Sequence, residues 1–325
     1  MHPIPALLTD HLWQSSVAGL ALLALLLLSR ALSARTRRAL AWLGLAQLAV
    51  PAAPLLGWLW SKLPTGAPTL SAAVPVLPGE WLRPVVVLAA APAHRPELWN
   101  WAAGAWAAGF AGLFGLWLLR GWRFRRSLLA TAEPPSGQTA AAIAAAARRL
   151  GLRRPLSCRE AGSDFGPGVL GWIRPVVILP RGLRDGLTAE EFDAIVIHEL
   201  IHVRRRDSLL SLLQALLISA FWFNPVAWLL HRALREETER SCDESVLAVT
   251  ADPDSYASGI LKALRYSLGA SAPAFAGALT LPVASRLKAI LAYERRSEHR
   301  LWRWAALAAG FALAAFSGRA GSISG

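Results

Sequence analysis

Two histidines four residues apart, with a glutamate beside the first, are the residues of this chain best suited to chemistry. His198, Glu199 and His202 form the pattern H-E-x-x-H within Ile195–His202. Side chains four positions apart on a helix lie one above the other on one face, so both imidazoles can bind one ion. Zinc accepts neutral imidazole nitrogens, and a catalytic zinc site keeps one position open for water. Glu199 is then placed to take a proton from that water and pass it to a leaving amine.

The residues before this motif predict the helix that it requires. Thr188 and Glu191 match the T-x-x-E capping box, which places the start of a helix at Thr188. The alternative is an ordinary core helix that carries two histidines by coincidence. A third metal ligand elsewhere in the chain would argue against that alternative.

A third ligand is predicted downstream, where Glu239 and Asp243 are four residues apart and share one face of a helix. We predict that Glu239 completes a His-His-Glu zinc set. Asp243 is predicted to accept the second ring N–H of a ligating histidine, which would fix the tautomer of that ring. Glu236 is a rival ligand, and a solvated acidic face is the alternative for the whole group.

Other polar residues near the motif have both a functional and a structural interpretation. Asp207 follows three arginines, so it forms either a surface salt bridge or a contact that supports a metal ligand. His231 either donates to a developing oxyanion or caps its helix, and we favour the cap. Asn224 is predicted as a turn residue. Cys242 lies near the proposed site and could bind metal, but we favour a small buried thiol. With Cys158 it makes only two cysteines, which excludes a disulfide framework and favours a reducing compartment.

The composition is that of a membrane protein. Of the 325 residues, 54% are hydrophobic, 17% are charged and 15 are tryptophan. Apolar runs long enough to cross a bilayer explain this excess. The predicted spans are Leu12–Leu28, Ala39–Trp60 and Trp99–Leu119, and a shorter run at Leu301–Phe316 is predicted as the fourth.

The net charge of +13 arises largely from arginines that flank the apolar runs. They cluster at Arg30–Arg38, Arg120–Arg126 and Arg295–Arg303. Because Lys and Arg are enriched on cytoplasmic flanks, these clusters predict an N-terminus outside the membrane and a cytoplasmic region after Arg120. No recognised reader motif accompanies the charge, so we expect no direct binding of nucleic acid.

The apolar segment 208–231, which follows the motif, is predicted to form a membrane-associated helical hairpin rather than a span. A full crossing would put His202 and the downstream acidic ligand on opposite sides of the bilayer, and the metal site could not form. Asn224-Pro225 supplies a turn signal in the middle, because proline disfavours helical geometry in the residue before it.

A small β element is predicted before the motif, at Leu156–Glu160 and at a second strand framed by Pro175 and Pro180. The second strand consists of Val176, Val177, Ile178 and Leu179. It could bind an extended substrate backbone by strand addition, and plain core packing is the alternative. Helices are predicted at 138–150, 255–268 and 285–293, with a loop at Gly269–Pro282.

With these features in place, the chain resembles the membrane zinc peptidases of the beta-lactam-sensing antirepressor family (BlaR/MecR-like). The resemblance rests on the order of three N-terminal spans, Gly171–Pro180, the H-E-x-x-H motif, Phe223–Pro225 and Glu239–Asp243. It implies a gluzincin-like cytoplasmic peptidase domain, with zinc on His198, His202 and Glu239 and with Glu199 as the base.

The resemblance also implies a location and partners. Members of this family are multi-pass proteins of the bacterial inner membrane that can cleave themselves and act on a transcriptional repressor. The expected partners are therefore a protein substrate, which is a repressor or the chain itself, and the lipid bilayer. The antibiotic sensors of the family carry a penicillin-binding domain after the last span. We expect this chain, which ends at Gly325, to lack that domain.

These observations predict a mainly α membrane protein with about four transmembrane helices and a gluzincin-like zinc peptidase domain that includes a small β element. The predicted domains are an N-terminal membrane domain at 1–123, the peptidase domain at 124–300, and a C-terminal helix and tail at 301–325. The predicted function is zinc-dependent proteolysis in signal transduction or regulated proteolysis. Two alternatives stay open, namely a membrane receptor or scaffold with a structural zinc site and a membrane quality-control protease.

Overall fold

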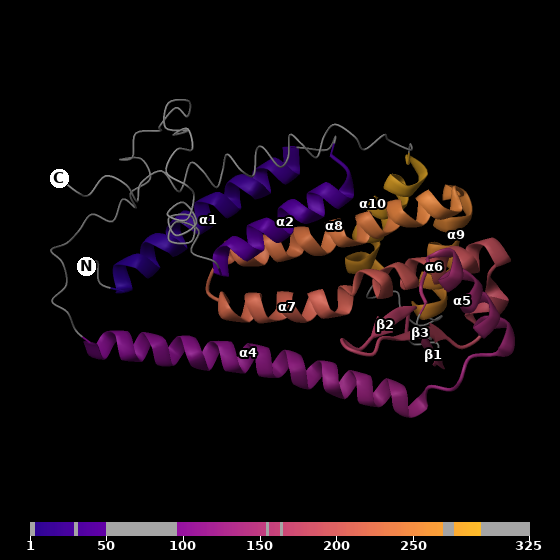
Figure 1. The fold of residues 1–325 in the computed structure, drawn as a ribbon, viewed down its shortest axis with the longest axis horizontal. Coiled ribbons are helices and arrows are strands. Elements are labelled where there is room, and N and C mark those ends of the chain that lie inside the picture. Colours follow the sequence, from indigo (N-terminus) through magenta and orange to yellow (C-terminus); the bar gives the residue numbers. More distant parts are fainter. Residues whose placement is uncertain are drawn as a thin grey trace, which may run out of the picture. The chain divides into compact units, whose positions relative to one another are not determined.

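The computed structural model describes residues 4–28, 32–49, 96–153, 156–162, 165–268 and 276–293. These residues are mainly helical with a small β element, as predicted (Figure 1). The element is a three-stranded sheet, and its strand at Gly168–Leu170 was not predicted. The chain divides into two compact units. The first comprises Met1–Leu113, Leu217–Glu237 and Glu298–Gly325, and the second comprises Phe114–Leu216 and Thr238–Ser297. Most of the hairpin segment 208–231 belongs to the same unit as the N-terminal helices.

In the first unit, α1 (Ile4–Leu28) and α2 (Ala34–Ala49) lie side by side (Figure 1). Their apolar faces form a core with residues of α8 (Pro225–Thr250). Two glycines permit this packing, since a Cβ on Gly19 would lie 2.9 Å from Val226 Cγ1 and one on Gly44 would lie 2.8 Å from Leu230 Cδ2. The small residues thus let α8 approach both helices closely.

The predicted spans are described only in part. The span Leu12–Leu28 lies within α1. Of Ala39–Trp60 the structure describes the helical part up to Ala49, and Leu301–Phe316 lies outside the described residues. By length and composition, His11–Leu28 and Leu98–Thr131 are able to cross a membrane.

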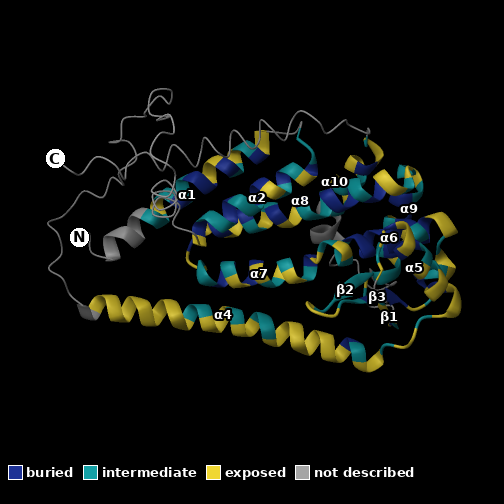
Figure 2. Cartoon of the chain, viewed as in Figure 1, coloured by how far each residue is buried: buried dark blue, intermediate teal, exposed yellow. Residues whose placement is uncertain are grey.

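Helix α4 (Pro96–Thr131) contains the predicted span Trp99–Leu119 and continues through the basic cluster Arg120–Arg126. Arginine is a good helix former, so the basic end of the apolar run does not end the helix. Most side chains of α4 are exposed (Figure 2), including large apolar ones such as Trp101 and Trp122. A continuous exposed apolar surface of this kind is typical of contact with lipid.

The segment 208–231 forms two helices joined by a turn, as predicted. Helix α7 (Asp207–Ala220) ends before the turn, and α8 begins at Pro225. Asn224 holds the turn, because its Oδ1 accepts a hydrogen bond from the Val226 N–H at 2.9 Å. His231 lies inside α8 rather than at a helix end, so the predicted helix cap is wrong.

The second unit contains the sheet, whose strand order is β1-β3-β2. β1 (Ser157–Ala161) is parallel to β3 (Val176–Pro180), and β2 (Gly168–Leu170) is antiparallel to β3. β3 is therefore the central strand, with a partner along each edge. Strand addition at Val176, Val177 and Ile178 is disfavoured, because these residues pair with β1 on one side and with β2 on the other. Leu179 pairs with β1 alone. The alternative of core packing fits Val177, Ile178 and Leu179, which are buried.

Three further helices complete this unit, namely α5 (Gly137–Arg149), α9 (Pro253–Leu268) and α10 (Ala276–Leu291). All three were predicted, but α10 starts earlier than expected. The predicted loop Gly269–Pro282 is therefore wrong from Ala276 onwards, and Gly269–Phe275 lies outside the described residues.

The motif helix α6 (Ala189–Arg205) is largely buried in its central turns (Figure 2). Thr188 caps it as predicted, since its Oγ1 accepts a hydrogen bond from the Glu191 N–H at 3.2 Å. The Glu191 carboxylate in turn accepts one from the Thr188 N–H at 2.9 Å. The helix ends at Arg206, whose left-handed φ of 55° turns the chain into α7. Caps at both ends thus fix the positions of the motif residues.

Candidate metal centre

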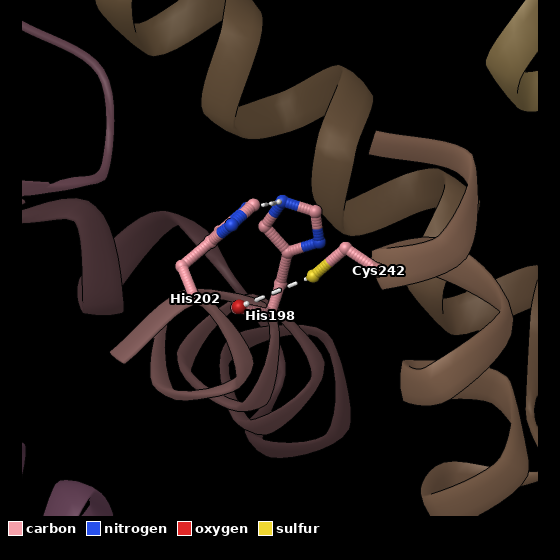
Figure 3. Close-up of side chains that lie close together, drawn as sticks. All are labelled: His198, His202 and Cys242. Carbon is pink, nitrogen blue, oxygen red and sulfur yellow. Dashed lines mark hydrogen bonds between the residues drawn. The ribbon is translucent and has the colours of Figure 1, made fainter. Parts of the chain in front are cut away.

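Helix α6 presents both imidazoles of the motif towards one point. The Nε2 atoms of His198 and His202 lie 3.2 Å apart, and the two rings are inclined at 80° (Figure 3). A tetrahedral zinc ion with Zn–N bonds of about 2.0–2.1 Å would separate two ligand nitrogens by about 3.3–3.4 Å. The spacing of the two nitrogens therefore suits a single ion.

Glu239, on α8, adds a carboxylate to this pair. Its Oε2 lies 3.7 Å from His198 Nε2, and its Oε1 lies 4.0 Å from His202 Nε2. The Glu239 side chain is 41% exposed, whereas those of His198 and His202 are 10% and 15% exposed. The three groups thus meet at a place that is buried on the imidazole side and open to solvent on the carboxylate side.

The other nitrogen of each ring already has a hydrogen-bond partner. His202 Nδ1 lies 2.7 Å from Asp207 Oδ2. His198 Nδ1 lies 2.7 Å from the Tyr256 hydroxyl, which donates its own proton to Asp243 Oδ1 at 2.7 Å. Since a carboxylate accepts only and the tyrosine proton is committed, both Nδ1 atoms must donate.

When both rings are neutral, as metal binding requires, their Nε2 atoms present lone pairs that face each other across 3.2 Å. Two acceptors at this distance repel unless a cation lies between them. Neutral imidazole nitrogens and a carboxylate are ligands that zinc prefers. The residues present therefore fit a zinc ion on chemical grounds as well as by spacing.

Asp243 and Arg286 extend this network. Asp243 accepts hydrogen bonds from Arg286 Nε at 3.0 Å and from Nη2 at 2.8 Å. Arg286 Nη1 also lies 3.3 Å from Glu239 Oε2. The sequence led us to expect direct contact between Asp243 and a ligand ring, but Tyr256 lies between them, and Asp243 Oδ1 is 3.6 Å from His198 Nδ1.

Sequence reasoning missed Tyr256 and Arg286. They lie on α9 and α10, at separations of 13 and 43 residues from Asp243, where no short motif connects them to it. The only signals were weak ones, since the chain has just 3 tyrosines and Arg286 is a cation within a largely apolar segment.

The electrostatics of the site favour proton acceptance by Glu199. This side chain is buried, and burial raises the pKa of its carboxyl, although the two imidazoles and Arg286 oppose the shift. For His202, burial acts to lower the pKa, but the hydrogen bond to Asp207 and the interaction with Cys242 together outweigh it, and the pKa rises to about 10. A general base works best when its pKa is close to the working pH, so burial suits Glu199 to that role.

Cys242 belongs to the same cluster. The thiol is fully buried, as expected, and lies on α8. Within the described part of the chain, its sulfur and one ligand atom from each of His198 and His202 lie within 4.8 Å of one another (Figure 3). The thiol also donates a weak hydrogen bond to the His198 carbonyl oxygen at 3.5 Å. A second donor of the type that binds zinc is thus present beside the imidazoles.

The rival ligand Glu236 is engaged elsewhere. Its Oε1 accepts a hydrogen bond from Arg232 Nε at 3.1 Å on the same helix. Its neighbour Glu237 is buried, and Oε1 of Glu237 accepts a hydrogen bond from Arg37 Nη2 at 2.6 Å. Of these neighbouring acids, Glu239 is the one that approaches the two imidazoles.

Comparison with known proteins gives matches to one family. The profile of the family described as BlaR1 peptidase M56 matches residues 10–290. Regulatory protein BlaR1 of Bacillus licheniformis is 40% identical over 81 residues, which cover 25% of this chain and 13% of that protein. Methicillin resistance mecR1 protein of Staphylococcus aureus is 29% identical over 83 residues, which cover 26% of this chain and 14% of that protein. The aligned stretches thus span only a small part of these curated relatives.

Proposed function

Because the chain belongs to the BlaR1 peptidase M56 family, which matches residues 10–290, we propose that it is a membrane zinc endopeptidase that acts in regulated proteolysis. The observation that carries this proposal is the meeting of two imidazole Nε2 atoms and the Glu239 carboxylate within 4.0 Å. When bound there, zinc would polarise the scissile carbonyl and lower the pKa of water to roughly 7.

In this proposal His198, His202 and Glu239 hold the ion, and Glu199 is the general base. Glu199 takes a proton from the attacking water and delivers it to the nitrogen of the leaving amine. The raised pKa of its buried carboxyl favours the first transfer. The same carboxyl then returns the proton, so one side chain serves both steps.

The surrounding residues prepare the ligands. Asp207 and Tyr256 each accept an Nδ1–H, which keeps the Nε2 lone pairs available. Asp243 orients Tyr256, and Arg286 holds Asp243 with two hydrogen bonds. Arg286 also offsets the negative charge of Glu239, so the site gathers several carboxylates without leaving them unpaired.

The substrate and the setting are part of the proposal. The relatives are named as a regulatory protein and as a methicillin resistance protein. By analogy, we propose that the substrate is a transcriptional repressor or the chain itself. Two apolar helices and the flanking arginines support a multi-pass arrangement in a bacterial inner membrane, with the N-terminus outside and the peptidase residues in the cytoplasm.

The test compares wild type with Glu199→Gln in liposomes. Glu236→Gln is the matched control, because Glu236 is an exposed acid that does not approach the two imidazoles. Fragments that co-purify with the protein are identified by mass spectrometry, and zinc content is measured for each variant. We expect Glu199→Gln to keep its zinc and lose the fragments, and Glu236→Gln to behave as wild type. Full cleavage by zinc-loaded Glu199→Gln would refute the mechanism.

One observation favours a second candidate function. Cys242 could join two histidines and Glu239 in a set of four protein ligands, which is the arrangement of structural zinc sites. A receptor or scaffold of that kind would need zinc for stability and would cleave no partner. A quality-control protease would use the same residues as the proposed enzyme, and a broad substrate range would distinguish it.

A further inference from the structure

We propose that Cys242 is a reversible fourth protein ligand that closes the metal site in the resting protein. Withdrawal of Cys242 would free one coordination position for water and so start proteolysis. This inference rests on the proposed function, because it concerns the regulation of the same metal site. Its basis is the cluster of Cys242 with His198 and His202, whose ligand atoms lie within 4.8 Å of one another.

The two ligands that α8 can offer differ in their exposure to solvent. Cys242 is fully buried, whereas the Glu239 side chain is 41% exposed. Figure 3 shows the sulfur reaching from α8 towards His198. An ion held by the imidazoles can therefore gain a thiolate from the buried side while Glu239 approaches from the open side.

The helix geometry makes the exchange possible by a small motion. Residues three apart on an α-helix differ by about 60° in direction, since 3.6 residues complete a turn. A modest rotation of α8 about its own axis would thus move Cys242 away from the ion while Glu239 stays within reach. Glu239 and Cys242 lie on the same continuous helix, so one rotation of that helix moves both side chains together.

The thiol has a second partner for the open state. Its sulfur lies 3.5 Å from the His198 carbonyl oxygen and can donate its proton there. On ligation, an S–metal bond replaces the S–H bond, and the proton is released to solvent. On withdrawal, the sulfur regains a proton from solvent and restores the hydrogen bond. Neither state leaves the buried sulfur without a partner.

The consequence follows from the number of ligands. Zinc sites with four protein ligands are closed and structural, whereas catalytic sites have three protein ligands and an open position. The same chain would then be latent with Cys242 bound and active with Cys242 withdrawn. This accounts for a buried thiol beside a set of ligands that already contains two imidazoles and a carboxylate.

Cobalt substitution tests this proposal without a known substrate. The full chain is purified in detergent, stripped of metal and titrated with Co²⁺, and thiolate ligation is read from near-ultraviolet sulfur-to-cobalt charge-transfer absorption. Wild type is compared with Cys242→Ser. Cys158→Ser is the matched control, because it removes the chain's other cysteine and leaves the metal cluster intact. We expect the charge-transfer band in wild type and in Cys158→Ser and its loss in Cys242→Ser.

A second readout guards against misfolding of the buried serine variant. Cys242→Ala is titrated with Cd²⁺ and Zn²⁺ in competition with a chromophoric chelator, because Cd²⁺ prefers thiolate more strongly than Zn²⁺ does. We expect Cys242→Ala to lose most of the preference for Cd²⁺ over Zn²⁺, because the soft thiolate ligand is removed. An unchanged preference overturns the thiolate ligand.

The outcomes separate this proposal from the proposed function. One equivalent of Co²⁺ bound without a charge-transfer band, or with a band that persists in Cys242→Ser, overturns the thiolate ligand and leaves the His-His-Glu site standing. If wild type binds no stoichiometric Co²⁺ and His202→Ala leaves metal binding unchanged, both the thiolate ligand and the proposed His-His-Glu site are overturned.

Discussion

Asp207 lies 2.7 Å from His202 Nδ1, across the C-terminal end of α6. The left-handed conformation of Arg206 reverses the chain at this point and brings the carboxylate back onto the ring. Asp207 is buried, and its Oδ2 also lies 3.8 Å from Arg205 Nε. The ion pair with a preceding arginine is therefore present but is not at the surface. A carboxylate behind a ligating histidine fixes the tautomer of the ring and raises its basicity.

We predict that Asp207→Asn weakens zinc binding by roughly tenfold to 100-fold, because the amide cannot stabilise the donating Nδ1–H as a carboxylate does. Chelator competition on the purified protein measures the Kd. The control is Asp193→Asn, since Asp193 is also on α6 but pairs with Arg149 at the surface. Equal affinity in wild type and Asp207→Asn would contradict the assigned role.

We predict that Tyr256→Phe destabilises the metal-free protein by about 1–3 kcal/mol, the cost of a buried polar group left without its partner. The hydroxyl it removes joins His198 Nδ1 to Asp243 Oδ1. Urea unfolding in detergent measures the loss, and zinc affinity should fall with it. Tyr266→Phe on the same helix removes a hydroxyl that bonds the Arg181 carbonyl at an exposed site, so it should change neither quantity appreciably.

We predict that the stability supplied by Glu191 is lost in acid. Burial raises the pKa of this carboxyl, but hydrogen bonds from Lys262 and Ser258 outweigh that effect and lower it below 4.5. A lowered pKa in the folded state means that the stability is present above about pH 4.5 and falls as pH drops through the folded-state value.

Lys262→Met should therefore reduce the free energy of unfolding most at neutral pH, and the difference from wild type should shrink below about pH 4.5. Urea unfolding in detergent at pH 7 and at acid pH gives the comparison. Lys288→Met is the control, since Lys288 is an exposed lysine on α10. A pH-independent effect of Lys262→Met would show that packing alone is responsible.

We predict that Arg37→Met destabilises the first unit by about 3–5 kcal/mol, because it removes the cation that lies against the buried Glu237 carboxylate. The side chains of the pair are 11% and 4% exposed, and their charged atoms lie 2.6 Å apart. The double variant Arg37→Met/Glu237→Met should recover most of the loss, as two apolar side chains replace the ion pair. Thermal unfolding in detergent provides the measurement.

The matched control for this pair is the exposed pair Arg232–Glu236, both residues of which lie on α8 beside Glu237. Their side chains are 81% and 50% exposed. Arg232→Met should change stability by no more than about 0.5 kcal/mol. If Arg37→Met has an effect equally small, the buried pair does not stabilise the packing of α2 on α8.

The sequence by itself determined the parts of this protein that depend on local rules. The capping box at Thr188 and the four-residue spacing of His198 and His202 are set by helix geometry, so the motif helix and its paired imidazoles were predictable. Asn224-Pro225 predicted the hairpin turn for the same reason, since its signal lies within the dipeptide.

Only the tertiary structure decided which residues far apart in the chain meet. β3 is central because β1 and β2 both pair with it, and strand order is not written in the hydrophobic pattern of any one strand. Tyr256 and Arg286 reach the site because α9 and α10 pack in the same unit as α6, through apolar contacts that carry no local signature. The choice among Glu236, Glu237 and Glu239 likewise depended on packing, since each acid faces a different neighbour around α8.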